Sequence, residues 1–368
     1  MVGFSYDQLR WQYAQAEKQT ICKNAERVGI VLLFIVGLQF AAAFADVLAG
    51  AVLSSSGLTP LSEILQERGM AAYMLATFAT YLVYMGVPVF VGWLLFRKQD
   101  VAVVPHEKTD GSFGVGLVLL GIGMMAIANM VGSYILVALE AIGITPAETP
   151  VMQDGTVPVL LLNILVVGLA PAVLEELLFR GVVLQGLRGA GDTVALVGSA
   201  LMFGLMHGTL YQLPFAFILG LVFGYIVLKT GNILWSMGLH AVNNTLSVLM
   251  EYWLRNMTEE QAGKWYLLFL AIETLLGVIG AAVLMLRSHP RVSPVGDRVR
   301  SWLTLKERRR AMYSSATVII FIALMALVTV GNLQFEGRPG FGSGAGELPS
   351  LGTGGEQQSA AVFAEVFR

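Results

Sequence analysis

The sequence is poor in charged residues, which make up only 13% of its 368 residues. Ordinary soluble domains carry roughly 25%. Hydrophobic residues make up 56% of the chain, and its mean hydropathy is +0.70. This composition excludes an ordinary soluble domain and indicates an integral, multi-pass membrane protein.

Cysteine is nearly absent, because Cys22 is the only one in the chain. An internal disulfide and a metal site built from several cysteines are therefore excluded. The sequence also lacks a Walker loop, a dinucleotide-binding fingerprint, an internal repeat and a basic nucleic-acid patch. We therefore expect no nucleic-acid partner, and the first expected partner is the lipid bilayer.

Apolar runs of roughly 20 residues, the length that crosses a bilayer, recur along the chain. They predict an all-α fold, a polytopic transmembrane helical bundle with about eight to nine spans. The run 192–208 is short and the run 232–254 contains polar residues, so these two are the weakest candidates. The candidate spans are 28–53, 71–96, 113–142, 157–180, 192–208, 211–229, 232–254, 265–286 and 313–332.

The chain divides into five predicted segments. Residues 1–27 mix aromatic and basic side chains, which suits an interfacial helix or a solvated tail on the cytoplasmic side, and they contain no signal-peptide pattern. The other segments are N-terminal transmembrane helices (28–142), a transmembrane core (157–254), C-terminal transmembrane helices (265–332) with a basic cytoplasmic loop (287–312), and a Gly-rich flexible tail (333–368).

The distribution of basic residues predicts the orientation, because cytoplasmic loops retain Lys and Arg. With the N-terminus inside, 17 of the 23 Lys and Arg residues fall on the cytoplasmic side and 5 on the other, while Arg180 lies in a span. We therefore predict a cytoplasmic N-terminus in a multi-pass membrane protein, located in the cell membrane if the source is prokaryotic.

Ionisable groups inside apolar runs are costly and mark functional sites by default. Glu175 and Glu176 are adjacent, and Arg180 follows in the same run. On a helix, Glu176 and Arg180 are four residues apart and can pair. Glu175 is turned about 100° away from that pair. The sequence therefore predicts one structural carboxylate and one that is free for chemistry.

Two histidines also lie in apolar runs, and each shares a helix face with a second residue four positions away. His207 pairs in this way with Phe203, and His240 with Asn244. Either histidine alone is more often a packing residue. Together with Glu175 they could activate water and stabilise an oxyanion. Glu175, His207 and His240 could equally hold a zinc ion with an open position, and spacing does not choose between these assignments.

The predicted depths of these residues constrain the fourth helix. From the predicted cytoplasmic boundaries, helix rise places His207 about 22 Å deep, His240 about 12 Å and Glu175 about 8 Å. A shared site requires similar depths. Tilted helices would reduce the difference. So would a fourth helix that continues past Arg180 to Leu187, which would place Glu175 about 18 Å deep.

Three stretches resemble, in order and spacing, the motifs of the CAAX protease and bacteriocin-processing family of intramembrane endopeptidases, also called the CPBP or ABI family. The resemblance covers about residues 157–250. The matching stretches are Glu175-Glu176-x-x-x-Arg180, Phe203-x-x-x-His207 and His240-x-x-x-Asn244.

The resemblance implies an all-helical protease that cleaves a membrane-associated protein or peptide; it does not imply that the substrate is prenylated. Glu175 and His207 would activate the attacking water, and His240 and Asn244 would stabilise the oxyanion. The family is described both as metalloproteases and as metal-independent glutamate proteases. The resemblance favours the latter and leaves zinc as the alternative cofactor. The residues that would support the site are Glu176, Arg180 and Phe203.

Two other classes of function remain open from the residues alone. Glu and His in membrane spans also serve transporters and proton relays, although no sequence repeat supports that reading. A catalytically idle scaffold or immunity factor is the third alternative.

Overall fold

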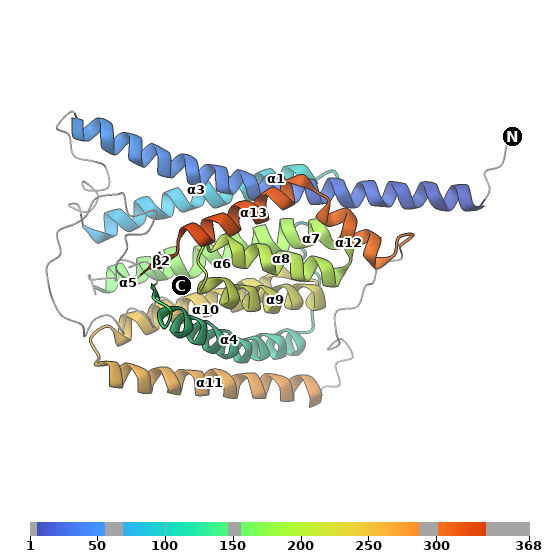
Figure 1. The fold of residues 1–368 in the computed structure, drawn as a ribbon. Coiled ribbons are helices and arrows are strands. Elements are labelled where there is room, and N and C mark those ends of the chain that lie inside the picture. Colours follow the sequence, from blue (N-terminus) through green and yellow to red (C-terminus); the bar gives the residue numbers. More distant parts are fainter. Residues whose placement is uncertain (1–5, 56–68, 100, 146–155, 287–300, 336–368) are drawn as a thin grey trace.

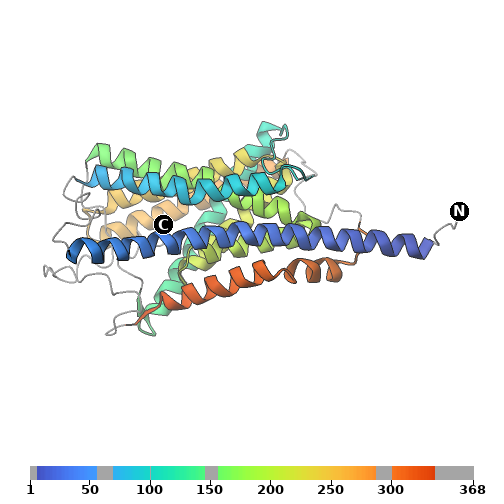
Figure 2. The ribbon, with the colours of Figure 1, turned by 90° about the horizontal axis from the view of Figure 1, so that it is seen from above.

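The computed structural model describes residues 6–55, 69–99, 101–145, 156–286 and 301–335, and most of them are helical. The helices run roughly along one direction and form a bundle (Figures 1 and 2). The predicted all-α class is confirmed. A short antiparallel pair, β1 (Ile144–Thr145) with β2 (Gln334–Phe335), is an addition to it.

Each predicted apolar run coincides, within a few residues, with helical structure, and helix also covers residues 6–27, 181–190 and 305–312, which the runs leave out. The continuous ones are α1 (Tyr6–Ser55), α3 (Met70–Phe96), α4 (Gly111–Glu140), α8 (Asp192–Met206), α9 (Gln212–Thr230), α10 (Ile233–Leu254), α11 (Glu259–Leu286), α12 (Leu305–Tyr313) and α13 (Ala316–Gly331). A further helical run is divided into α5 (Val157–Asn163), the π-helix η1 (Ile164–Leu169), α6 (Ala170–Glu176), the π-helix η2 (Leu177–Val183), α7 (Leu184–Leu187) and the 3-10 helix η3 (Arg188–Ala190).

Among the described residues, six helices are long and apolar enough to cross a membrane, or seven if the bent pair α12–α13 is one span. The predicted eight to nine spans therefore exceed the number that the helices support by length and composition. The difference lies in α8, which has only 15 residues, and in α10, whose polar side chains lower its hydropathy. Both α8 and α10 pack within the bundle. They correspond to the runs 192–208 and 232–254, the two weakest candidates in the sequence.

The fourth span is longer than predicted. The sequence predicted a span that ends at residue 180, but the helical run continues from Val157 to Ala190. Residues 178–187 are buried, so they pack inside the bundle instead of forming a loop. This is the extension that would place Glu175 nearer the predicted depth of the two histidines.

The first helix has no break at residue 27. Helix α1 has 50 residues, which corresponds to about 75 Å of helix, whereas the hydrocarbon core of a bilayer is about 30 Å thick. Its N-terminal part extends beyond the other helices (Figures 1 and 2). One helix therefore contains both the predicted segment 1–27 and the first predicted span, and its length leaves room for a part outside the bilayer. The boundary at residue 27 stays a prediction.

Helices α8 and α9 form a tight hairpin in the middle of the bundle (Figure 1). A Cβ atom added to Gly220 would lie 2.9 Å from the Cα atom of Ala200, so only glycine permits this approach of the two helices. The turn between them begins at Gly208, whose φ of +69° favours glycine. This turn places His207 at the tip of α8.

Residues 1–5, 56–68, 100, 146–155, 287–300 and 336–368 lie outside the described residues. Most of the predicted basic loop and almost all of the predicted Gly-rich tail fall there. Their predicted roles stay predictions.

Candidate active site

The helical run 157–190 is irregular on both sides of Glu175 and Glu176, which lie in α6 between the π-helices η1 and η2. Single π-turns inside helices are rare and frequent at functional sites. Pro171 has no N–H to donate to the carbonyl four residues earlier, which is that of Val167. The Val167 carbonyl instead accepts a hydrogen bond from Asn244 Nδ2 at 3.1 Å. The proline therefore frees a backbone acceptor that fixes a side chain of α10.

Glu176 and Arg180 form the ion pair that their spacing predicts. Arg180 NH1 lies 2.8 Å from Glu176 Oε1, and both side chains are essentially unexposed. Arg180 NH2 donates to the carbonyl of Gly220 at 3.3 Å. The guanidinium carbon also lies 4.4 Å from the ring centroid of Phe203 and 5.0 Å from that of Phe223. Charge pairing and aromatic faces together make this arginine tolerable inside the bundle.

Glu176 has a second partner that the sequence did not predict. Its Oε1 atom accepts a hydrogen bond from His240 Nδ1 at 3.1 Å. The other ring nitrogen, Nε2, lies 3.8 Å from Glu175 Oε2, and the imidazole stacks on Phe223 with the ring centroids 4.9 Å apart. His240 is therefore held between the two adjacent glutamates, and the supporting role assigned to Glu176 extends to the histidine.

His207 is held by the main chain of its own helix. Its Nδ1 atom lies 2.9 Å from the carbonyl oxygen of Phe203. A carbonyl can only accept, so Nδ1 carries the proton and donates. In the neutral ring, Nε2 is then an acceptor. The ring of Phe203 packs edge-on against His207, with centroids 5.0 Å apart, and the predicted pairing of these two residues on one face is present.

Asn244 is held by two hydrogen bonds. Besides the bond to Val167, its Oδ1 atom accepts from Asn243 Nδ2 at 2.9 Å. Asn243 itself is buried. One N–H of the Asn244 amide is therefore committed to the backbone, and the second is available to a ligand.

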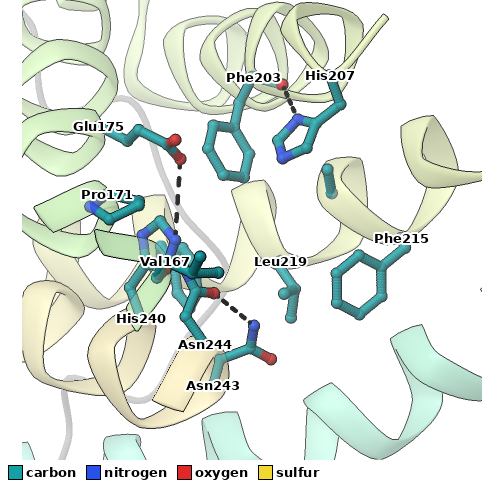
Figure 3. Close-up of a pocket in the computed structure, with 12 residues that line it drawn as sticks. Val167, Pro171, Glu175, Phe203, His207, Phe215, Leu219, His240, Asn243 and Asn244 are labelled. Carbon is teal, nitrogen blue, oxygen red and sulfur yellow. Dashed lines mark hydrogen bonds and ion pairs between the residues drawn. The ribbon is translucent and has the colours of Figure 1, made fainter. Parts of the chain in front are cut away.

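All four residues predicted to be catalytic line one cavity of about 150 Å³, which has room for a few water molecules. Figure 3 shows Glu175 and His207 on either side of the ring of Phe203. His240, Asn243 and Asn244 lie below them in this view. The cavity has a polar part made by these residues and an apolar wall. The side chains of that wall are Val167, Pro171, Phe215, Ala216, Leu219 and Phe223.

The residues do not form a recognisable metal site. Within the parts of the chain that the structure describes, no group of three or more His, Cys, Asp or Glu side chains is placed to hold a metal ion. The alternative zinc set, Glu175, His207 and His240, surrounds a common cavity without the convergence that a tetrahedral site needs. We therefore derive no step through a metal.

Sequence reasoning missed three contributions to this site. Asn243 had a weak signal, because it precedes Asn244. The apolar wall from α9 had none, because Phe215 and Leu219 are ordinary residues of an apolar helix. Tyr81 of α3 also had none, although its hydroxyl donates to Glu175 Oε1 at 3.1 Å.

Part of the chain matches a known protein family. Residues 157–246 match the family described as "Type II CAAX prenyl endopeptidase Rce1-like". The matched region begins at α5 and ends within α10, so it contains all four residues predicted to be catalytic. No curated protein and no solved structure matches the chain.

Proposed function

Residues 157–246 form an Rce1-like type II CAAX prenyl endopeptidase domain, and from this premise we propose a mechanism for the cavity. The family and the long apolar helices make the chain an intramembrane endopeptidase in general terms. The observation that supports the mechanism best is that Glu175, His207, His240 and Asn244 line one cavity.

In this mechanism Glu175 is the general base. It takes a proton from a water molecule whose oxygen attacks the carbonyl carbon of the scissile peptide bond. Nε2 of His207 accepts the second hydrogen of that water, because Nδ1 is committed to the Phe203 carbonyl. Collapse of the tetrahedral intermediate breaks the C–N bond, and the leaving amine takes the proton back from Glu175.

His240 and Asn244 stabilise the oxyanion of the tetrahedral intermediate. Since Glu176 accepts the Nδ1 hydrogen bond of His240, Nε2 can donate only when the ring is an imidazolium. The free N–H of the Asn244 amide is the second donor.

The substrate is a membrane-associated protein or peptide. The apolar wall contributed by α9 suits an apolar substrate side chain next to the scissile bond. Contact between that side chain and the wall removes apolar surface of both from water, which lowers the free energy of binding. The family name refers to a prenyl endopeptidase that acts on CAAX proteins. The substrate of this chain is either prenylated or unprenylated, and an assay with both forms of a peptide distinguishes the two. The cytoplasmic orientation of the N-terminus belongs to the same proposal.

The test uses the full chain, purified and reconstituted in lipid vesicles, with an internally quenched CAAX peptide in prenylated and unprenylated forms. We expect wild type to cleave one or both and Glu175→Gln, which keeps the shape but not the basicity, to lose at least about 10²-fold in rate, as expected for a general base. A chelator should leave wild-type activity unchanged. Full activity of Glu175→Gln would remove Glu175 from the mechanism.

A further inference from the structure

The helix α3 lies outside the matched region and yet contacts the proposed base. The Tyr81 hydroxyl on α3 donates a hydrogen bond to Glu175 Oε1 at 3.1 Å. The two residues are 94 positions apart in the chain. The matched region begins at residue 157, so this contact comes from a part of the chain to which no role is assigned.

The contact gives the two oxygens of the Glu175 carboxylate different neighbours. Oε1 accepts from Tyr81, and Oε2 lies 3.8 Å from Nε2 of His240. The second oxygen is therefore the one directed toward the polar part of the cavity, as the view in Figure 3 shows. A carboxylate without the Tyr81 bond could rotate about its last side-chain torsion, which is broad for glutamate.

Tyr81 is itself held in place. Its ring packs edge-on against that of Tyr84, with the centroids 5.0 Å apart and an interplanar angle of 86°. Helix α3 contacts α5, η1, α6 and η2 of the catalytic domain, and the ring is half-buried against the core. The hydroxyl is thus presented by a packed helix and not by a loop, which is what pre-organisation of a base requires.

We propose that Tyr81 is a positioning residue for the base: its hydroxyl holds Glu175 Oε1 so that Oε2 faces the attacking water. This inference rests on the proposed role of Glu175. It predicts that the catalytic domain alone is incomplete, because α3 supplies a contact to the reacting group.

The experiment compares Tyr81→Phe with Tyr84→Phe in the full-length chain, using the quenched CAAX peptide in vesicles. Tyr81→Phe keeps the ring and its packing and removes only the hydroxyl. We expect kcat to fall about 10-fold to 100-fold, the cost of a misplaced catalytic group. KM should stay within about twofold of wild type, because the hydroxyl positions the base and does not bind the substrate. Tyr84→Phe, which keeps the ring against Tyr81, should match wild type.

Two further variants connect the effect to Glu175. In a Glu175→Asp background the shorter side chain cannot reach the hydroxyl, so Tyr81→Phe should cause no additional loss, a non-additivity that a purely structural role would not produce. Tyr81→Gln retains an N–H donor and should recover part of kcat.

The outcomes separate this inference from the proposed function. Wild-type kcat in Tyr81→Phe, while Glu175→Gln is inactive, would overturn the role of Tyr81 and leave the mechanism standing. Equal losses in Tyr81→Phe and Tyr84→Phe, or a loss in Tyr81→Phe that follows a lowered unfolding temperature, would also overturn it. Full activity of Glu175→Gln would instead remove the proposed base itself.

Discussion

At the scale of single residues, the site is a cluster of buried charges arranged around aromatic rings. Phe203 contacts Arg180, His207 and His240 through its ring. Glu176 accepts from His240 and pairs with Arg180 through the same oxygen. Removing one charged side chain therefore leaves its partner's charge buried without compensation. This loss lowers the free energy of unfolding by more than the intact pair contributes to it.

We predict that Arg180→Met destabilises the protein by about 3–5 kcal/mol, the usual cost of leaving one buried charge unpaired. The double variant Glu176→Gln/Arg180→Met has no unpaired carboxylate at this position, and glutamine can still accept from His240. It should be more stable than Arg180→Met alone. Unfolding temperatures in detergent measure both, and additive losses would contradict this account.

At the scale of helices, the packing of α11 shows how close contact replaces hydrophobic burial in a membrane. Helix α11 lies at the edge of the bundle against α4 (Figure 1). A Cβ atom added to Gly277 would lie 2.6 Å from the Cα atom of Gly123. Membrane helices associate through such small residues, because lipid tails are as apolar as the helices themselves.

The glycine contact gives a prediction with a control on the same helix. Gly277→Leu should force α11 from α4 and lower stability by about 1–3 kcal/mol, the range for overpacking. Gly263→Leu should cost little from packing, because a Cβ atom added there meets nothing within 4 Å. Thermal unfolding of the two purified variants compares them, and an equal loss in both would attribute the effect to the loss of glycine alone.

At the scale of the whole molecule, the basic segments meet at one end of the bundle. The N-terminal part of α1 contacts α12, where Cys22 Sγ donates to the Ala311 carbonyl. The connection after α3 bonds to the end of α9, since the N–H of Glu107 donates to the Gly231 carbonyl. Both contacts lie at the end that the proposed orientation places in the cytoplasm.

The proposed orientation predicts which end is accessible from outside the cell. In a Cys22→Ser background, which removes the chain's only cysteine, a cysteine replaces either Gln8 of α1 or Asn256 after α10; both positions are exposed. An impermeant thiol reagent should label Asn256→Cys on intact cells and Gln8→Cys only after permeabilisation, because the proposed orientation places the N-terminus in the cytoplasm. The reverse pattern would invert the topology.

The sequence by itself determined the class of the protein and the partners within each helix. Charge is costly at membrane depth, so the few polar residues in apolar runs pointed to the site. Helical periodicity then predicted the Glu176–Arg180 pair and the shared face of Phe203 and His207, because both depend only on residues four positions apart.

The tertiary structure alone decided the contacts between helices. No local sequence pattern predicts the hydrogen bond between Tyr81 and Glu175, which are 94 residues apart. None predicts that Asn244 donates to the carbonyl of Val167, to which Pro171 has no N–H to donate. The same holds for Glu176, whose second partner, His240, comes from a helix 64 residues later. Such contacts depend on the depth and rotation of each helix, which packing between helices sets.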